Sequence, residues 1–203
     1  MKKPLLFALT LVLSGNLLLA SGCSTPIKRL HKAYNKSDIE TICKVVDTAK
    51  EPWLVADGAE YLVRLKASNA MTSTMRETRV LPVLQKRLSD EYLSQEALAN
   101  VAVALLKLGN AEDIPLVIST LERLTDTDEH CKLLEALTSR CTPEAIAAMQ
   151  HDAQSSDVLV NRTAVKALNT CKGKEQPAAA APKEGQNTDK APSSSSNAAK
   201  RRR

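Results

Sequence analysis

A phrase of about thirty residues recurs along this chain, and it limits the fold more than any other feature does. Residues 104–118 align with residues 136–149 at an offset of 32, which places Leu105 over Leu137 and Ile114 over Ile146. Related phrases occupy residues 166–173 and, in a weaker copy, the residues from Ser37 onward. A repeat of this length predicts a row of similar units, each of which buries its apolar side chains mainly against its neighbours.

Each unit is predicted to be a pair of short helices. Apolar residues recur at spacings of three and four, which puts them on one face of a helix. Two such stripes are Leu98, Val101, Leu105 and Leu108, and then Ile114, Val117, Ile118 and Leu121. Gly and Pro stand at the expected corners, which are Pro52, Gly58, Gly109 and Pro143. No strand-like alternation is sustained, so the sequence predicts an all-α fold.

These phrases resemble the HEAT-repeat family, particularly its short bacterial form. The best match spans residues 94–121, with an Ala-Leu-rich first helix, a Gly-Asn corner and an Ile-Pro-Leu second helix. The resemblance implies a HEAT-like α-solenoid of about four helix pairs over residues 37–172. Solenoids bind partners along extended concave surfaces, so the expected function is protein binding.

The first 22 residues have the order of a secretory signal peptide. Two lysines follow Met1, an apolar run fills most of residues 4–20, and small residues precede Cys23. Residues 20–23 read Ala-Ser-Gly-Cys and resemble a bacterial lipobox, in which the Cys is acylated and becomes the first residue after cleavage. The resemblance implies that Cys23 holds the protein on a membrane, and Ser24 in the next position favours the periplasmic face of an outer membrane. The alternative is ordinary cleavage after Ala20, which leaves Cys23 as a free or paired thiol.

Residues 23–36 are predicted to be the lipidated N-terminus and a short linker. Residues 173–203 contain no branched aliphatic or aromatic residue, so they are predicted to be a disordered tail. Residues 172–203 carry eight Lys or Arg against three acids, whereas residues 24–171 carry 18 bases and 20 acids. The body therefore lacks the basic surface of a nucleic-acid-binding domain. A cationic terminus that could contact an anionic surface is formed by Lys200, Arg201, Arg202 and Arg203.

Two cysteines stand at corresponding positions of adjacent repeats. Cys141 and Cys171 follow the first helices of their units, so a disulfide between them is one expectation, and two small buried hydrophobes are the other. A metal set would combine His130, Cys131, Cys141 and His151. Their spacing matches no closely spaced ligand pair, so we expect no metal and no cofactor.

The expected function is therefore that of a non-catalytic binding scaffold or assembly factor in the bacterial cell envelope, with an envelope protein as partner. No nucleophile elbow, P-loop, zinc-protease or dinucleotide-binding motif is found in the sequence. The second helices of the repeats supply the predicted binding face, which comprises Ile114, Leu116, Val117, Leu121, Ile146 and Gln150. Two alternatives stay open: an enzyme or enzyme accessory with a His/Cys metal site, and a passive envelope component whose basic tail binds a polyanionic surface.

Overall fold

The computed structural model describes residues 25–175, and all regular structure within this range is helical, with no strand. The predicted signal peptide, Cys23 and the tail from residue 176 onward, including its four terminal cations, lie outside the described residues. Between residues 25 and 175, no helix is both long enough and apolar enough to cross a membrane.

The helices follow one another with short connections. In chain order they are α2 (Pro26–Asn35), α3 (Ile39–Thr48), α4 (Pro52–Ala67), α5 (Ser73–Met75), η1 (Arg76–Val80), α6 (Leu81–Leu88), α7 (Gln95–Leu108), η2 (Ala111–Asp113), α8 (Ile114–Arg123), α9 (Thr127–Leu137), α10 (Pro143–Asp152) and α11 (Val158–Glu175).

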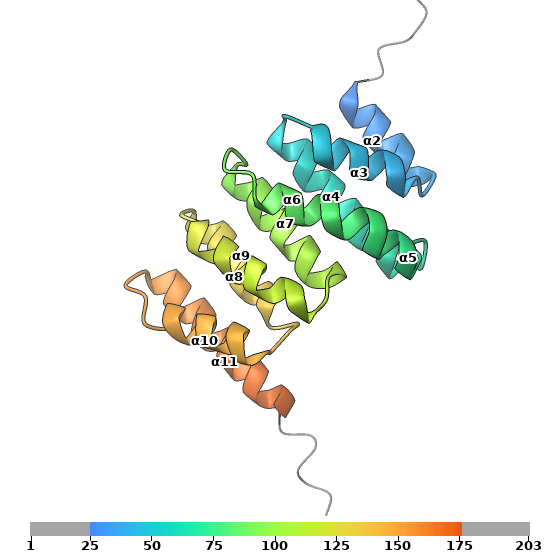
Figure 1. The fold of residues 1–203 in the computed structure, drawn as a ribbon. Helices are drawn as coiled ribbons and strands as arrows, with labels where there is room; N and C mark the ends of the chain where they lie inside the picture. The colour runs from blue at the N-terminus through green and yellow to red at the C-terminus, as the bar shows by residue number, and fades with distance from the viewer. Residues whose placement is uncertain (1–24, 176–203) are drawn as a thin grey trace, which may run out of the picture.

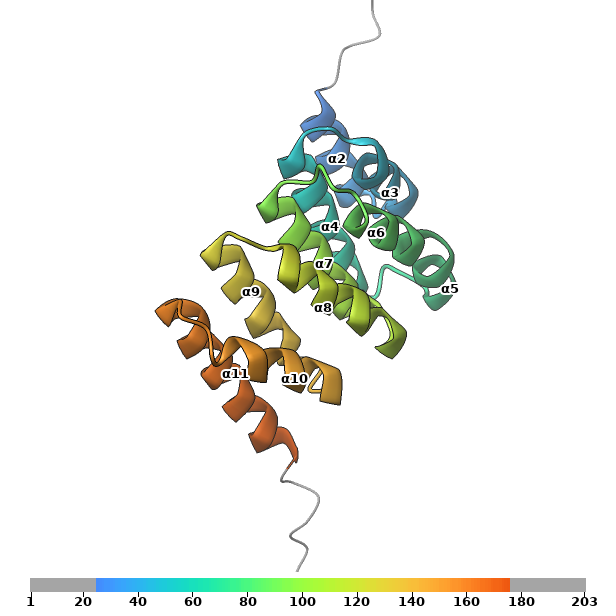
Figure 2. The ribbon, with the colours of Figure 1, turned by 60° about the vertical axis from the view of Figure 1, so that its left-hand side comes forward.

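The helices pack in two rows. One row contains α2, α4, α7, α9 and α11, and each of these contacts the next; the other contains α3, α6, α8 and α10, which also contact one another in order. Cross-row contacts join α3 to α4, α6 to α7, α7 to α8 and α10 to α11. Both views show α2 and α11 at opposite ends of the stack (Figures 1 and 2). Each helix of the two rows therefore packs mainly on helices that are close to it in the chain.

Short polar side chains begin several of the helices. The side chains of Asp38, Ser94, Asp126 and Thr142 each accept a hydrogen bond from a backbone N–H in the first turn of the following helix. Such a cap satisfies a donor that has no partner inside the helix. Proline occupies one of the first two positions of α2, α4 and α10, where its missing N–H costs no helical hydrogen bond. Pro82 and Pro115 lie near the starts of α6 and α8, which continue directly from η1 and η2. The corners predicted at Pro52 and Pro143 are confirmed by these starts.

Helix α7 lies at the centre of the core. Its leucines at positions 98 and 105 are almost completely buried, and its alanines at positions 97, 99, 102 and 104 are buried with them. Small side chains allow neighbouring helices to approach closely. In this way a chain with few aromatic residues fills its interior with many short aliphatic contacts.

The prediction that residues 23–36 form a linker is wrong for the residues that the structure describes. Residues 26–35 form α2, in which Leu30 and Ala33 are buried against the neighbouring helices. The ring of Tyr34 stacks on that of Tyr61 in α4, with 4.2 Å between centroids. Helix α2 is therefore the first packed element of the domain, and the helical domain begins earlier than residue 37.

The prediction of a corner at Gly58 is also wrong, because Gly58 lies inside α4. A Cβ atom at this position would lie 2.5 Å from Cγ2 of Val46 in α3. Gly58 therefore provides a close approach between α3 and α4 rather than a turn. At the other end of the domain, α11 continues through Glu175, three residues beyond the predicted end of the repeats.

Candidate functional site

A groove of about 830 Å³ lies between the second helices α8 and α10. It is lined by apolar residues and by acidic and histidine side chains. The lining residues are Pro115, Ile118, Ser119, Leu121, Glu122, Leu124, His130, Glu144, Ala147, Ala148, His151 and Asp152.

Helices α8 and α10 pack on each other, and residues of both line this groove. The face of α8 that contains Ile114, Val117 and Leu121 turns into the core. The adjacent face then presents Ile118, which is half-buried, toward α10. Helix α10 contributes Ala147 and Ala148, whose small side chains leave space in the groove.

Three residues of the predicted binding face are buried in the core, and of its six residues only Leu121 lines the groove. Ile114, Val117 and Leu121 are 3%, 0% and 4% exposed, so they cannot present an extended surface to a partner. The apolar stripe that the sequence shows on α8 is the stripe that the fold needs for its own core. Leu116 and Ile146 are half-buried against that core, and Gln150 is exposed, but none of these three lines the groove.

One edge of the groove is held by a histidine–aspartate pair that links α9 to α10. Nε2 of His130 lies 2.8 Å from Oδ2 of Asp152, and its Nδ1 lies 3.3 Å from the carbonyl oxygen of Leu124. The other carboxylate oxygen of Asp152 lies 3.2 Å from Nδ1 of His151. Since both ring nitrogens of His130 face oxygen acceptors, the geometry favours the imidazolium form, which donates from both.

The environment shifts the pKa values of both partners in the directions that favour a charged pair. The hydrogen bond to Asp152 raises the pKa of His130 above its ordinary value, against the opposing effect of burial. For Asp152, burial pushes the pKa upward, but the hydrogen bonds from His130 and His151 outweigh it, and the pKa of the carboxyl is lowered. Both side chains are mostly shielded from water, at 15% and 11% exposed, so solvent screens the pair less than it would at the surface.

This pair predicts a pH-dependent stability. A raised folded-state pKa means that the contribution of His130 is complete below about pH 6.5 and is lost as the pH rises through the folded value. The lowered pKa of Asp152 means that its contribution is present above about pH 3.9 and is lost as the pH falls through the folded value. The groups that face His130 are Asp152, Asp157 and the Leu124 carbonyl, and all three favour the charged ring.

We expect His130→Gln to lower the free energy of unfolding by about 1–2 kcal/mol at pH 6 and by less at pH 8. Urea denaturation of the wild type and the variant at both pH values measures this difference. His31→Gln is the matched control, because His31 is exposed and its only side-chain hydrogen bond within the described residues joins Nδ1 to the hydroxyl of Tyr61. An equal loss at pH 6 and pH 8 for His130→Gln would contradict the charged pair.

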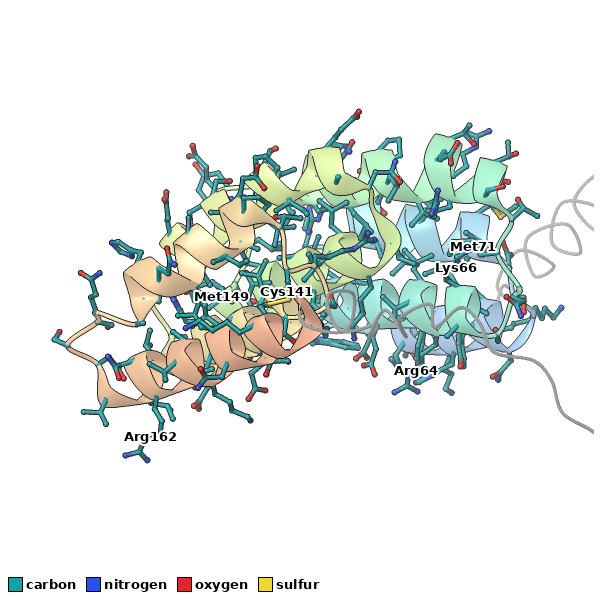
Figure 3. The ribbon with its side chains drawn as sticks, turned by 90° about the horizontal axis from the view of Figure 1, so that it is seen from below. Arg64, Lys66, Met71, Cys141, Met149 and Arg162 are labelled. Atoms are coloured by element: carbon teal, nitrogen blue, oxygen red, sulfur yellow. A yellow bond between two sulfur atoms is a disulfide. The ribbon has the colours of Figure 1, made fainter. Side chains whose placement is uncertain are left out.

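A disulfide joins Cys141, which follows α9, to Cys171 in α11, with 2.10 Å between the sulfurs and 5.5 Å between the Cα atoms (Figure 3). This is the pair that the repeat places at corresponding positions. The bond removes Cys141 from the candidate metal set, because a disulfide sulfur has no thiolate to offer. Within residues 25–175, no three His, Cys, Asp or Glu side chains are gathered in a way that could hold a metal ion.

The thiols of Cys43 and Cys131 are free in the described part of the chain. Burial raises the pKa of Cys43 to about 11, so this thiol stays protonated and unreactive at neutral pH. Cys131 is half-buried against the core in α9. Both therefore behave as small core side chains.

Sequence reasoning named His130 and His151 only as candidate metal ligands and did not find Asp152. No motif marks this aspartate. It is the last residue of α10, and it contacts His130 of α9 only because the chain folds back. Pro115, Ser119 and Ala147 lie in the predicted second helices but were not singled out, because only the packing shows which edge of each helix is left open. Comparison with known proteins finds no protein-family model, no curated protein and no solved structure that matches this chain.

Proposed function

We propose that this protein is an exported lipoprotein that acts as a non-catalytic protein-binding scaffold or assembly factor in the bacterial cell envelope. The proposed localisation is based on the sequence around Cys23, and the proposed binding role is based on the groove between α8 and α10. The helical domain is, in this proposal, a HEAT-like α-solenoid that displays the groove to an envelope protein on the periplasmic side of an outer membrane.

Recurring hydrogen bonds between neighbouring units support the solenoid. Long cationic side chains at helix ends donate to backbone carbonyl oxygens 31–38 residues earlier in the chain. The donors and acceptors are Arg87 to Ala49, Arg123 to Leu88 and Asp90, Arg140 to Leu106 and Gly109, and Lys174 to Thr138. Each bond satisfies a carbonyl near the end of a helix in the previous unit. The same device at successive positions is what a repeated unit stacked on itself would produce.

The groove carries the functional proposal, because it combines apolar surface with a charged edge. Ile118, Pro115 and Ala147 offer area that a partner could remove from water, and such burial is the main driving force of protein association. Glu122 and Glu144 are exposed at the edges. A segment with apolar side chains and at least one Lys or Arg complements this arrangement.

The polar groups of the groove favour binding over catalysis. The two ring nitrogens of His130 lie within hydrogen-bond distance of the Asp152 carboxylate and the Leu124 carbonyl oxygen, so neither nitrogen is left to accept a proton from a nucleophile. The hydroxyl of Ser119 donates to the Leu116 carbonyl at 2.8 Å, within its own helix. These contacts support a structural role for the charged pair, which holds α9 and α10 in register beside the groove.

A second groove, of about 560 Å³, lies over the first helices α4, α7 and α9. Its charged lining side chains have both signs, and two of its acids pair with basic neighbours: Glu60 with Arg64 and Glu135 with Lys166. Lys132 also pairs with Glu129, so most charges of this groove are already paired. Such a surface offers less to a partner than one with unpaired carboxylates. The groove between α8 and α10 is therefore the better candidate.

Site-specific photo-crosslinking in intact cells tests the proposal. A photoreactive residue at Ala147 in the groove should capture a defined envelope protein, whereas the same residue at Asn169 on α11 should not. Ala147→Glu should abolish capture from a second groove position, Ser119, without loss of stability. Mass spectrometry of the purified protein should detect acyl chains on Cys23. Capture of no envelope protein at Ala147, or equal capture at both positions, would contradict the binding role, and an unmodified Cys23 would contradict the anchor.

A further inference from the structure

Helix α2 and the turn that follows it carry a cluster of basic residues without an acid. Residues 25–37 contain four Lys or Arg and no acid, whereas residues 38–175 contain sixteen bases and twenty-one acids. Residues 158–174 of α11 also contain four Lys or Arg and no acid, so positive charge is in excess at the first and the last helix. The excess of negative charge lies between them, where residues 38–157 contain twelve bases and twenty acids. The four cations of residues 25–37 are Lys28, Arg29, Lys32 and Lys36.

The packing of α2 turns all of these cations outward. Successive residues of a helix are about 100° apart, so Lys28, Arg29 and Lys32 fall within one half of its circumference. Leu30 and Ala33 occupy the other half and are buried at 0% and 3% exposed. All four cations are classed among the exposed residues. The structure therefore presents one continuous cationic face, which we call the α2 basic face and define as Lys28, Arg29, Lys32 and Lys36.

The α2 basic face has no charge partner within the domain. No ion pair among residues 25–175 involves any of its four members. The first acid along the chain, Asp38, is engaged with the backbone N–H and the hydroxyl of Thr41 at the start of α3. By contrast, basic residues in α6 pair with acids, Lys86 with Asp47 and Arg87 with Asp90. Unpaired cations gathered on one helix are available to an external anion.

The position of α2 identifies the kind of anionic surface. Pro26, its first residue, lies three residues after Cys23, and three residues span at most about 11 Å. An acyl anchor on Cys23 would therefore hold the α2 basic face at the level of the lipid headgroups. Stable attachment commonly needs two signals, and an acyl anchor with a basic patch beside it is one such combination.

We propose that the α2 basic face binds the anionic headgroups of the membrane that carries the lipid anchor. This inference rests on the proposed acylation of Cys23 for its geometry, but the contact itself needs no acyl chain. The two rows of helices then lead away from the membrane. Helix α10, which lines the groove together with α8, lies toward the opposite end of the stack from α2 (Figure 1). The contact thus orients the domain with its groove accessible to a partner.

Vesicle sedimentation of a form of the chain that begins at Ser24 tests the contact without the anchor, and this form retains every described residue. We expect binding to vesicles of phosphatidylglycerol and phosphatidylcholine at low salt and none to phosphatidylcholine alone. The triple variant Lys28→Gln, Arg29→Gln, Lys32→Gln should bind the anionic vesicles at least about tenfold more weakly. Raising the salt to about 0.5 M should have the same effect on the wild type, because salt screens exposed charges.

Two control variants separate the possible outcomes. The triple variant Arg162→Gln, Lys166→Gln, Lys172→Gln removes the same charge from α11, which lies at the other end of the stack, and should bind as the wild type does. A variant with Lys200, Arg201, Arg202 and Arg203 replaced by Gln should also keep most of its binding. Equal losses in the α2 and α11 variants, or loss only in the tail variant, would overturn the proposal. Absence of wild-type binding would also overturn it, and would leave the acylation of Cys23 to be decided by mass spectrometry alone.

Discussion

Loss of the Cys141–Cys171 disulfide is expected to lower the free energy of unfolding by about 3–4 kcal/mol. The bond connects residues 30 apart in sequence, and a loop of this length has considerable entropy to gain in the unfolded chain when the bond is broken. Helix α11 packs on α9 and α10 alone among its principal contacts, so the loss should be concentrated at this end. Denaturant unfolding with and without reductant gives the total, and hydrogen exchange locates it in α10 and α11.

The double variant Cys141→Ala, Cys171→Ala is the control for the reductant. It should match the reduced wild type in stability, and reductant should not change it further, because Cys43 and Cys131 are already free thiols. Equal acceleration of exchange in α3 and α11 would contradict the local effect, since α3 shares no principal contact with the last three helices. No change in stability on reduction would contradict the contribution of the bond altogether.

The helices in the middle of the chain were predictable from the sequence, because their signals are local. The stripe from Leu98 to Leu108 predicted α7, and the Thr-Pro corner before Glu144 predicted the start of α10. The cysteine pair was accessible for a related reason, since repeat units stacked at a fixed period bring corresponding positions together. These inferences needed only spacing along the chain.

The errors arise where spacing alone does not say which side of a helix is covered. Val117 is apolar in the sequence whether it faces a partner protein or α7, and only the packing shows that it is buried. The same limit applies to α2, which was predicted to be part of a linker although Leu30 and Ala33 are spaced to form an apolar face. Gly58 was misread because glycine also occurs where two helices approach closely.

The groove lay beyond prediction for a further reason, because it depends on contacts between residues distant in sequence. Asp152 and His130 are 22 residues apart, and no motif connects them. Their pairing follows from the way in which α10 returns beside the turn at Leu124. A sequence can thus predict a helix such as α10, but which side of that helix stays uncovered depends on how all the helices pack.

The stability of the domain is expected to be far more sensitive to substitutions in α7, at its centre, than to substitutions at its ends. Helix α7 contacts α4 and α9 within its own row and α6 and α8 in the other row. Leu105, at 0% exposed, lies in this enclosed position, where its neighbours are helices fixed by their own contacts. Helices held in this way cannot collapse into the space that a smaller side chain leaves, so the cost of a cavity is near its full value.

Leu105→Ala is therefore expected to lower the free energy of unfolding by about 3–5 kcal/mol. The effect should extend through the domain, so hydrogen exchange in α4, α7 and α9 should accelerate together, unlike the response to disulfide reduction. Leu159→Ala is the matched control, because Leu159 is 46% exposed on α11 and its truncation should cost less than about 1 kcal/mol. Denaturant unfolding of both variants measures the difference. If the two substitutions proved equally costly, or if Leu105→Ala affected α7 alone, α7 would not be the element that joins the two rows, and each helix pair would have to be stable by itself.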